Sequence, residues 1–184
     1  MTDLKSREGA TFAVRLPIAA VRDAALAARS PTRPQRSSEE THWNFNAPPE
    51  LRGLRVLTVD DEPDAREIVA SILASCGVRV TTAASVGEAM AVVGREPPDV
   101  VLTDIGMPGE DGYSLIARLR ALPRNLGGAT PAACLTGYAS SEDRRRALLA
   151  GFTMHLPKPV DPAELIAVVT SLARMAKALR EPIA

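Results

Sequence analysis

The chain has 184 residues, of which 46% are hydrophobic, 24% charged and 3% aromatic. This length fits one domain with a tail or two small domains, and the composition predicts a core of aliphatic side chains. The 22 basic and 22 acidic residues cancel, so there is no global positive field that would favour nucleic acid, and no apolar run approaches the roughly 18 residues of a membrane span.

The N-terminal part shows no sustained periodicity. Residues 1–29 form a tail in which Arg15 and Arg22 interrupt the apolar stretch, which argues against a secretory signal. Residues 30–51 begin with SPTRPQRSSEETHWNFNAPPE, which is rich in Pro, Ser, Arg and Glu. We expect a flexible linker over 30–51, although Trp43 and Phe45 could dock on a neighbouring surface.

From Leu54 onward, short apolar runs alternate with amphipathic segments, which is typical of repeated βα units around a parallel sheet. The runs that we predict to be strands are RVLTV (55–59), VRVTTA (78–83), DVVLT (99–103), AACLT (132–136) and MHLP (154–157). The third and fourth are almost continuously apolar, as expected for strands covered on both faces. Cys76 and Cys134 lie in apolar contexts without metal-type spacing, so we expect reduced, buried thiols in a cytoplasmic protein.

Helices are predicted after each strand. Their expected ranges are 63–76, a second helix starting at Ser85, 113–122, a fourth helix starting at Ser140, and 161–180. Pro63 suits a first helical turn and Gly77 a helix end, and Ser85 with Glu88 forms a capping box. Strict alternation predicts an α/β fold, a doubly wound (βα)5 parallel sheet with helices on both faces.

Polar side chains stand where predicted strands end. Asp60 and Asp61 follow the first strand and Asp104 follows the third, while Thr136 ends the fourth and Lys158 follows the fifth. In an open parallel sheet, ligands bind beyond the carboxyl ends of the strands, here around the switch point between the first and third strands. We therefore expect these five side chains to gather at one edge.

Such a group has a specific chemistry. Three neighbouring carboxylates repel one another by about 4 kcal/mol per pair at about 4 Å in an effective dielectric of about 20. Proton uptake or a cation must offset this, and Mg²⁺ suits a site with few protein carboxylates. Asp104 could then act as a nucleophile that forms an acyl phosphate, with Lys158 neutralising charge and Thr136 donating to a phosphoryl oxygen. Taken singly, each residue is an ordinary turn, cap or surface residue.

The segment from Arg52 to Leu179 resembles the receiver domain of bacterial two-component response regulators. The matching motifs are LTVDDEPDAR, DVVLTDIGMPGEDGY, CLTGYAS and LPKPVDPAELI, in the order and at the spacings of that family. The resemblance implies a receiver domain over residues 52–180, with a flavodoxin-like sheet in the strand order 2-1-3-4-5.

The resemblance also implies a phospho-acceptor and a metal site. Asp104 would receive the phosphoryl group from a histidine kinase or a phosphotransfer protein. Asp61 and Asp104 would ligate Mg²⁺ directly, together with the backbone carbonyl of Gly106. Asp60 would act largely through water.

The remaining implied residues form a switch. Thr136 and Lys158 would be the switch hydroxyl and the phosphate-pairing lysine, and Lys158–Pro159 would be a cis peptide. The switch aromatic of that family falls on His155, whose imidazole can still rotate inward and whose coupling can depend on pH. Gly106 and Tyr138 occupy positions that resemble those tuning dephosphorylation.

The N-terminal tail has a second resemblance. REGATFAVRLPI (7–18) is similar to the last strand region of the ATP-binding domain of sensor histidine kinases. Nothing else of that domain is recognisable, so we expect no kinase ATP site, and His42 lacks the helical setting of a phosphodonor. Two interpretations stay open, a C-terminal receiver of a hybrid kinase and a stand-alone regulator.

The end of the chain bears on the output. It stops shortly after the fifth predicted helix, so we expect no DNA-binding domain and no direct DNA contact. The run Arg144–Arg146, next to Glu142 and Asp143, is interpreted as a solvated, ion-paired face. We expect a protein partner to read the face made by the fourth helix, the fifth strand and the fifth helix.

Enzymes of two classes fit less well. A phosphatase or phosphotransferase of the haloacid-dehalogenase type also uses an aspartyl phosphate, but it requires Asp-x-Asp after its first strand, where this chain has adjacent aspartates. A nucleotide- or flavin-binding domain requires a Gly-rich first turn, where this chain has DDEPD. The chain is therefore not expected to be an enzyme in its own right.

Overall fold

The structure, a computed structural model, describes residues 47–137 and 140–180. The predictions made for the tail at 1–29, for most of the linker and for Tyr138 lie outside these residues. None of the helices within the described ranges is long and apolar enough to cross a membrane.

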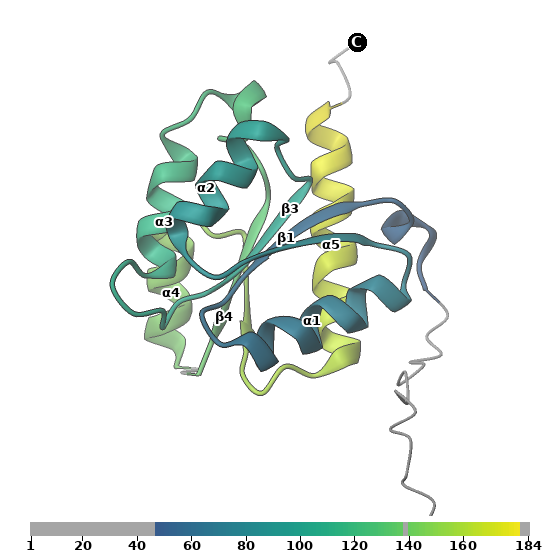
Figure 1. The fold of residues 1–184 in the computed structure, drawn as a ribbon, viewed down its shortest axis with the longest axis horizontal. Coiled ribbons are helices and arrows are strands. Elements are labelled where there is room, and N and C mark those ends of the chain that lie inside the picture. Colours follow the sequence, from purple (N-terminus) through teal and green to yellow (C-terminus); the bar gives the residue numbers. More distant parts are fainter. Residues whose placement is uncertain (1–46, 138–139, 181–184) are drawn as a thin grey trace, which may run out of the picture. The chain divides into compact units, whose positions relative to one another are not determined.

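Five parallel strands form one sheet in the order β2-β1-β3-β4-β5 (Figure 1). The strands are β1 (Arg55–Val59), β2 (Arg79–Ala83), β3 (Val100–Asp104), β4 (Ala132–Thr136) and β5 (Met154–Pro157). This order confirms the predicted doubly wound, flavodoxin-like sheet. β3 begins and ends one residue later than predicted. Asp104 is therefore the last residue of this strand and not the residue after it.

Five α-helices cover the sheet: α1 (Pro63–Ser75), α2 (Val86–Arg95), α3 (Gly112–Arg120), α4 (Ser141–Ala150) and α5 (Pro162–Arg180). The predicted caps are confirmed for α2 and α4, since the side chains of Ser85 and Ser140 accept from the third residue of each helix. The Glu88 carboxylate accepts from Ala84 N at 2.8 Å rather than from Ser85 N. The predicted third helix, 113–122, begins one residue earlier because the side chain of Asp111 caps it by accepting from Ser114 N, and it ends at Arg120.

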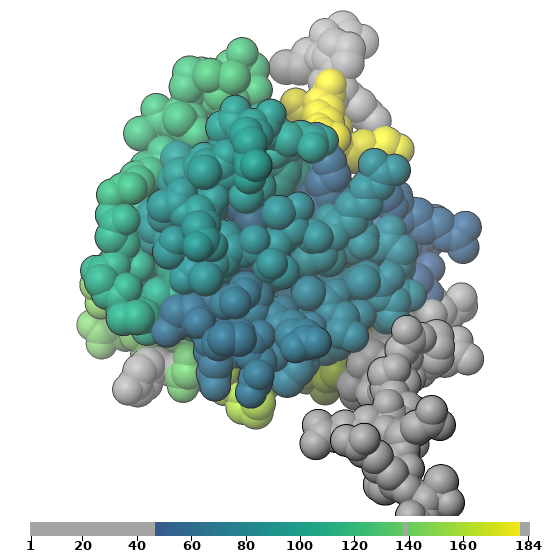
Figure 2. Space-filling view, viewed as in Figure 1, coloured from purple at the N-terminus to yellow at the C-terminus, as the bar shows by residue number. Residues whose placement is uncertain are grey.

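The helices divide between the two faces of the sheet (Figure 1). α1 and α5 pack over one core and α2, α3 and α4 over the other, and side chains fill the spaces that the ribbon leaves open (Figure 2). Every residue of β3 and β4 is buried, which confirms that both are covered on two sides. Cys76 and Cys134 are free and buried as expected, and burial raises the pKa of the Cys134 thiol to about 11, which keeps it protonated and unreactive.

The folded unit begins before Arg52. Pro49–Leu51 form a short 3-10 helix, η1, and Leu51 is fully buried in the core beneath α1 and α5. Glu50 accepts from the guanidinium of Arg174 on α5 at 2.9 Å. The last residues of the expected linker therefore belong to the packed domain, because Leu51 contributes apolar burial that a solvated linker does not.

A buried carboxylate ties together the amino-terminal edge of the sheet, at the opposite end of the strands from Asp104. Asp99 is 7% exposed and accepts from Arg55 N and Arg55 Nη2, both at 2.9 Å, and from Arg180. Burial alone would raise the pKa of Asp99, but the hydrogen bonds from Arg55 outweigh it, and the pKa is lowered. The start of β1, the start of β3 and the end of α5 are thus joined through one side chain.

Replacing Leu51 with alanine tests whether η1 is part of the fold. We expect Leu51→Ala to lower the free energy of unfolding by about 2–5 kcal/mol, as is usual for a buried leucine. Leu126→Ala is the matched control, because Leu126 is 51% exposed and should cost no more than about 0.5 kcal/mol. Urea unfolding of both variants measures this. Equal small losses would mean that residues before Arg52 do not stabilise the domain.

Replacing Asp99 with asparagine tests the ion cluster. At pH 7 we expect Asp99→Asn to lower the free energy of unfolding by about 1–3 kcal/mol. Because the folded pKa lies below the ordinary value of 3.8, this contribution is present above pH 3.8 and is lost as the pH falls through the folded pKa. The difference from the native chain should therefore shrink in acid.

Glu96→Gln is the control for that experiment, since Glu96 also contacts Arg55 but is 71% exposed. An exposed pair of this kind is worth about 0–1 kcal/mol. Urea unfolding from pH 7 down to pH 3 makes the comparison. A loss in Asp99→Asn that is independent of pH would contradict the role assigned to its charge.

Candidate functional site

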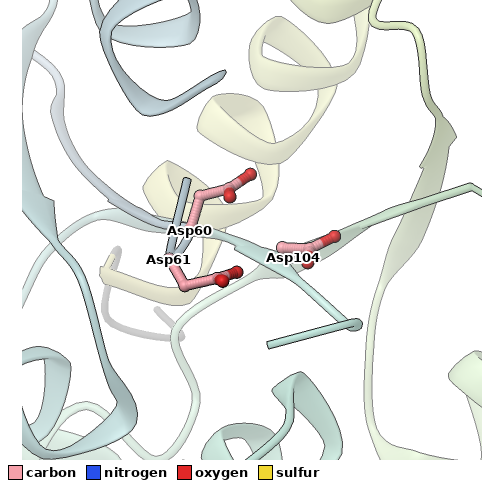
Figure 3. A group of neighbouring side chains, drawn as sticks. All are labelled: Asp60, Asp61 and Asp104. Atoms are coloured by element: carbon pink, nitrogen blue, oxygen red, sulfur yellow. The ribbon is translucent and has the colours of Figure 1, made fainter. Parts of the chain in front are cut away.

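Three carboxyl groups meet where β1 and β3 end (Figure 3). One carboxylate oxygen from each of Asp60, Asp61 and Asp104 lies within 4.8 Å of the others. The two strands are neighbours, with Val59 opposite Thr103, so the residues at their carboxyl ends come together as predicted. Asp60 and Asp104 are buried, whereas Asp61 is exposed and leaves the group open to solvent on its side.

Lys158 joins this group from the end of β5. Its Nζ atom lies 2.8 Å from Asp60 Oδ2 and 2.9 Å from Asp104 Oδ1. Burial alone would lower the pKa of Lys158, but its hydrogen bonds to Asp60 and Asp104 outweigh burial and raise the pKa. The amine therefore stays protonated and offsets part of the repulsion between the carboxylates. Its peptide bond to Pro159 is cis, as the resemblance implied.

Thr136 reaches the same edge at the end of β4 and is buried. Its carbonyl accepts from Lys158 N at 2.7 Å, so the ends of β4 and β5 are held together. His155 lies on β5 opposite Cys134 and is half-buried. Leu135 and Leu156 point into the core beneath α1 and α5, so by alternation Thr136 and His155 face the side of the sheet that carries α4.

Two glycines shape the loop after Asp104. A Cβ atom on Gly106 would lie 3.3 Å from Asp104 Oδ2, and one on Gly112 would lie 2.4 Å from Asp104 O. A side chain at Gly106 would therefore crowd the carboxylate, and the backbone at Gly112 admits no side chain. Gly106 was identified from the sequence, whereas Gly112 was not, because its constraint arises only from the return of the loop to Asp104.

Sequence reasoning also missed Arg66. Its Nη1 atom donates to Asp60 O, while Glu62 N donates to Asp60 Oδ1 at 3.0 Å. Asp60 is thus fixed at both its backbone and its side chain. The position of Arg66 in the sequence was a signal for this contact. The positive end of the helix dipole disfavours a cation near the first turn, so an arginine there needs a nearby acceptor.

The donor set fits a hard divalent cation. Among the described residues, the group holds three carboxylates against the ammonium of Lys158, and the exposed Asp61 leaves a path for a hydrated ion. Asp60, Asp61 and Asp104 are the residues that could hold it, and the space beside Gly106 lies next to Asp104 Oδ2. The arrangement can receive a group that carries several negative oxygens once such a cation is present.

Comparisons with known proteins agree with this geometry. Residues 56–170 match the family model of the response regulator receiver domain. An uncharacterized 14.6 kDa protein of Leptolyngbya boryana is 44% identical over 119 residues, which are 65% of this chain and 89% of that protein. The solved structure of the chemotaxis response regulator CheY4 of Vibrio cholerae is 30% identical with a TM-score of 0.61, and the match covers 65% of this chain and 98% of that one.

Another relative is much longer than this chain. Hybrid signal transduction histidine kinase D of Dictyostelium discoideum is 34% identical over 138 residues, which are 72% of this chain but 9% of the kinase. The similarity to that kinase therefore concerns one small part of it.

Magnesium should stabilise the native chain. At a free Mg²⁺ concentration of 100 times the dissociation constant, binding to the folded state alone adds about 2.7 kcal/mol. We expect Asp61→Asn to abolish most of this gain, because it removes the exposed ligand without opening the core. Asp64→Asn is the control, as Asp64 is also exposed but lies outside the group. The test is the rise in melting temperature across a MgCl₂ titration. An equal rise for the native chain and Asp61→Asn would rule out the assigned site.

Proposed function

This chain belongs to the response regulator receiver domain family of two-component signalling, and we propose that it acts in a phosphorelay as a Mg²⁺-dependent phosphoryl acceptor. The observation that carries the proposal is the contact of one ammonium group, that of Lys158, with both Asp60 and Asp104 at 2.9 Å or less. Three different strands supply these groups. An ammonium at this place can pair with an anion that arrives at Asp104.

Asp104 is the proposed nucleophile. A carboxylate oxygen of Asp104 attacks the phosphorus of a phosphohistidine on a histidine kinase or a phosphotransfer protein. The new O–P bond forms as the N–P bond breaks, which gives an acyl phosphate and an imidazole that takes up a proton from solvent. Lys158 then exchanges its contact with Asp104 Oδ1 for a phosphoryl oxygen and keeps its contact with Asp60.

The proposed metal ligands are Asp61, Asp104 and the backbone carbonyl of Gly106, with Asp60 acting through water. When bound, Mg²⁺ would neutralise part of the charge on the transferring phosphoryl group. Asp60 is held by Glu62 N and Lys158, which orients it without requiring direct contact with the ion. Gly106 keeps free space beside Asp104, and it is a position expected to influence hydrolysis together with Tyr138, which lies outside the described residues.

The proposed output is a change of surface. Thr136 moves to donate its hydroxyl to the phosphoryl group, and His155, which faces the same side of the sheet, adjusts with it. A protein partner then reads the face of α4, β5 and α5. The family membership and the similarity to a hybrid histidine kinase support a place in kinase signalling, and we propose the cytoplasm as its location.

A second proposal concerns the setting of the domain. The similarity to hybrid kinase D and the resemblance of residues 7–18 to the end of a kinase ATP-binding domain favour a C-terminal receiver of a hybrid kinase. The genomic sequence upstream of the codon for Met1 tests this. A kinase reading frame continuous with this one supports the hybrid, and an unrelated upstream gene favours a stand-alone regulator.

Labelling with acetyl phosphate tests the nucleophile. With Mg²⁺ present, we expect the native chain to gain the mass of one phosphoryl group, and we expect Asp104→Asn and Asp104→Ala to gain none because the attacking carboxylate is gone. Asp99→Asn, which alters a buried aspartate at the other edge of the sheet, should still be labelled. Intact-mass spectrometry of the native chain and the three variants measures the added phosphoryl mass. Labelling of either Asp104 variant would place the nucleophile elsewhere, and sustained phosphate release would favour a phosphatase.

A further inference from the structure

α4 is attached to the domain by less buried surface than the other helices. Of its ten residues only Ala147 is buried, whereas α1, α2, α3 and α5 each bury three or more. Its apolar residues Leu148 and Leu149 are 47% and 78% exposed. A helix with so few buried contacts has low local stability, so the contacts of its polar side chains weigh heavily in fixing its position.

Arg146 makes such a contact. Its guanidinium carbon lies 4.6 Å from the centroid of the Tyr113 ring on α3, which is a cation–π distance. The Tyr113 ring packs edge-on against Phe152, with centroids 6.1 Å apart and planes at 70°, and Phe152 N donates to Ala147 O at 3.1 Å. Arg144, Arg145 and Arg146 are all exposed, as expected for a solvated face, and Arg146 in addition stacks on an aromatic ring.

Tyr113 is fixed to the strand that carries Asp104. Gly112, directly before it, packs against Asp104 O so closely that no Cβ fits, and Gly112 N donates to Ile105 O at 3.2 Å. Asp111 accepts from Ser114 N at 2.8 Å and fixes the first turn of α3. The Tyr113 ring therefore keeps its position relative to the end of β3.

Arg146 belongs to a different part of the molecule. α4 follows β4 through the short segment that begins at Thr136 and ends at the cap residue Ser140. A movement of Thr136, at the end of β4, toward a phosphoryl group on Asp104 would shift α4 relative to Tyr113, which stays with β3. The contact between Arg146 and Tyr113 thus spans the two parts that the switch would displace.

We propose that the Arg146–Tyr113 contact is a latch that holds α4 in its resting position and opens when Asp104 is phosphorylated. The opening of the latch rests on the function proposed above. The resemblance places the switch position of β5 on His155, where that family has an aromatic residue. The aromatic ring that contacts Arg146 on α4 is that of Tyr113 on α3. A cation–π contact at an exposed site shifts an equilibrium by about two- to fivefold, so the latch biases the position of α4 and does not lock it.

Hydrogen exchange in the resting full-length chain tests the latch directly. We expect Arg146→Gln to speed exchange of the α4 amides by about two- to fivefold, with no change in α5. Arg146→Lys should retain part of the protection, and Tyr113→Phe should retain most of it because the ring remains. Arg145→Gln is the matched control, as Arg145 is an exposed arginine on the same helix.

A double-mutant cycle separates the contact from general loosening. In a Tyr113→Leu background, Arg146→Gln should have no further effect, since its partner ring is already absent. The latch is refuted if Arg146→Gln matches Arg145→Gln, or if its effect persists unchanged in the Tyr113→Leu background.

Phosphorylation supplies the second arm. With acetyl phosphate and MgCl₂, occupancy is read by intact mass, and α4 of the native chain should exchange as fast as α4 of unphosphorylated Arg146→Gln. Full phosphorylation with unchanged α4 exchange would overturn the opening of the latch. If no phosphorylation occurs, the proposed function falls and the opening with it, while the resting comparison still decides whether the contact holds α4.

Discussion

The ammonium group of Lys158, placed between two buried carboxylates, is the interaction on which the rest of the site depends. Asp60 and Asp104 come from neighbouring strands and are both withdrawn from water, where like charges repel strongly. Lys158 contacts both, and removing one member of such a group would leave uncompensated charge in the interior. The backbone N–H of Lys158 also donates to Thr136 O, so this one residue links the ends of β1, β3, β4 and β5.

The two edges of the sheet use charge in opposite ways. At the amino-terminal edge, Asp99 is paired with both Arg55 and Arg180, and its negative charge is fully matched. At the carboxyl edge, the carboxyl groups outnumber the ammonium. A matched cluster stabilises the fold, whereas an excess of carboxylates leaves attraction for a cation. This difference supports placing the proposed phosphoryl-acceptor site at the carboxyl edge.

The two faces of the sheet differ in how firmly their helices are held. α5 buries eight residues and is further joined to η1 by the ion pair of Glu50 and Arg174. α4 buries one residue and turns two leucines to solvent. Displacing α4 would therefore cost less free energy than displacing α5, because less apolar contact has to be broken. The two exposed leucines lie on a helix of the face that we propose a protein partner reads.

The sequence by itself determined the five strands, the caps of α2 and α4, the doubly wound sheet and the strand ends on which Asp60, Asp61, Asp104, Thr136 and Lys158 stand. These features are readable because hydrophobic period and capping depend on residues a few positions apart. Only the tertiary structure decided that Lys158 touches Asp60, 98 positions away, that Leu51 is core, that Gly112 has no room for a side chain, and that Arg146 stacks on Tyr113. Those contacts depend on how whole strands and helices pack in space, and no local pattern in the chain records the distance between two segments that meet only after folding.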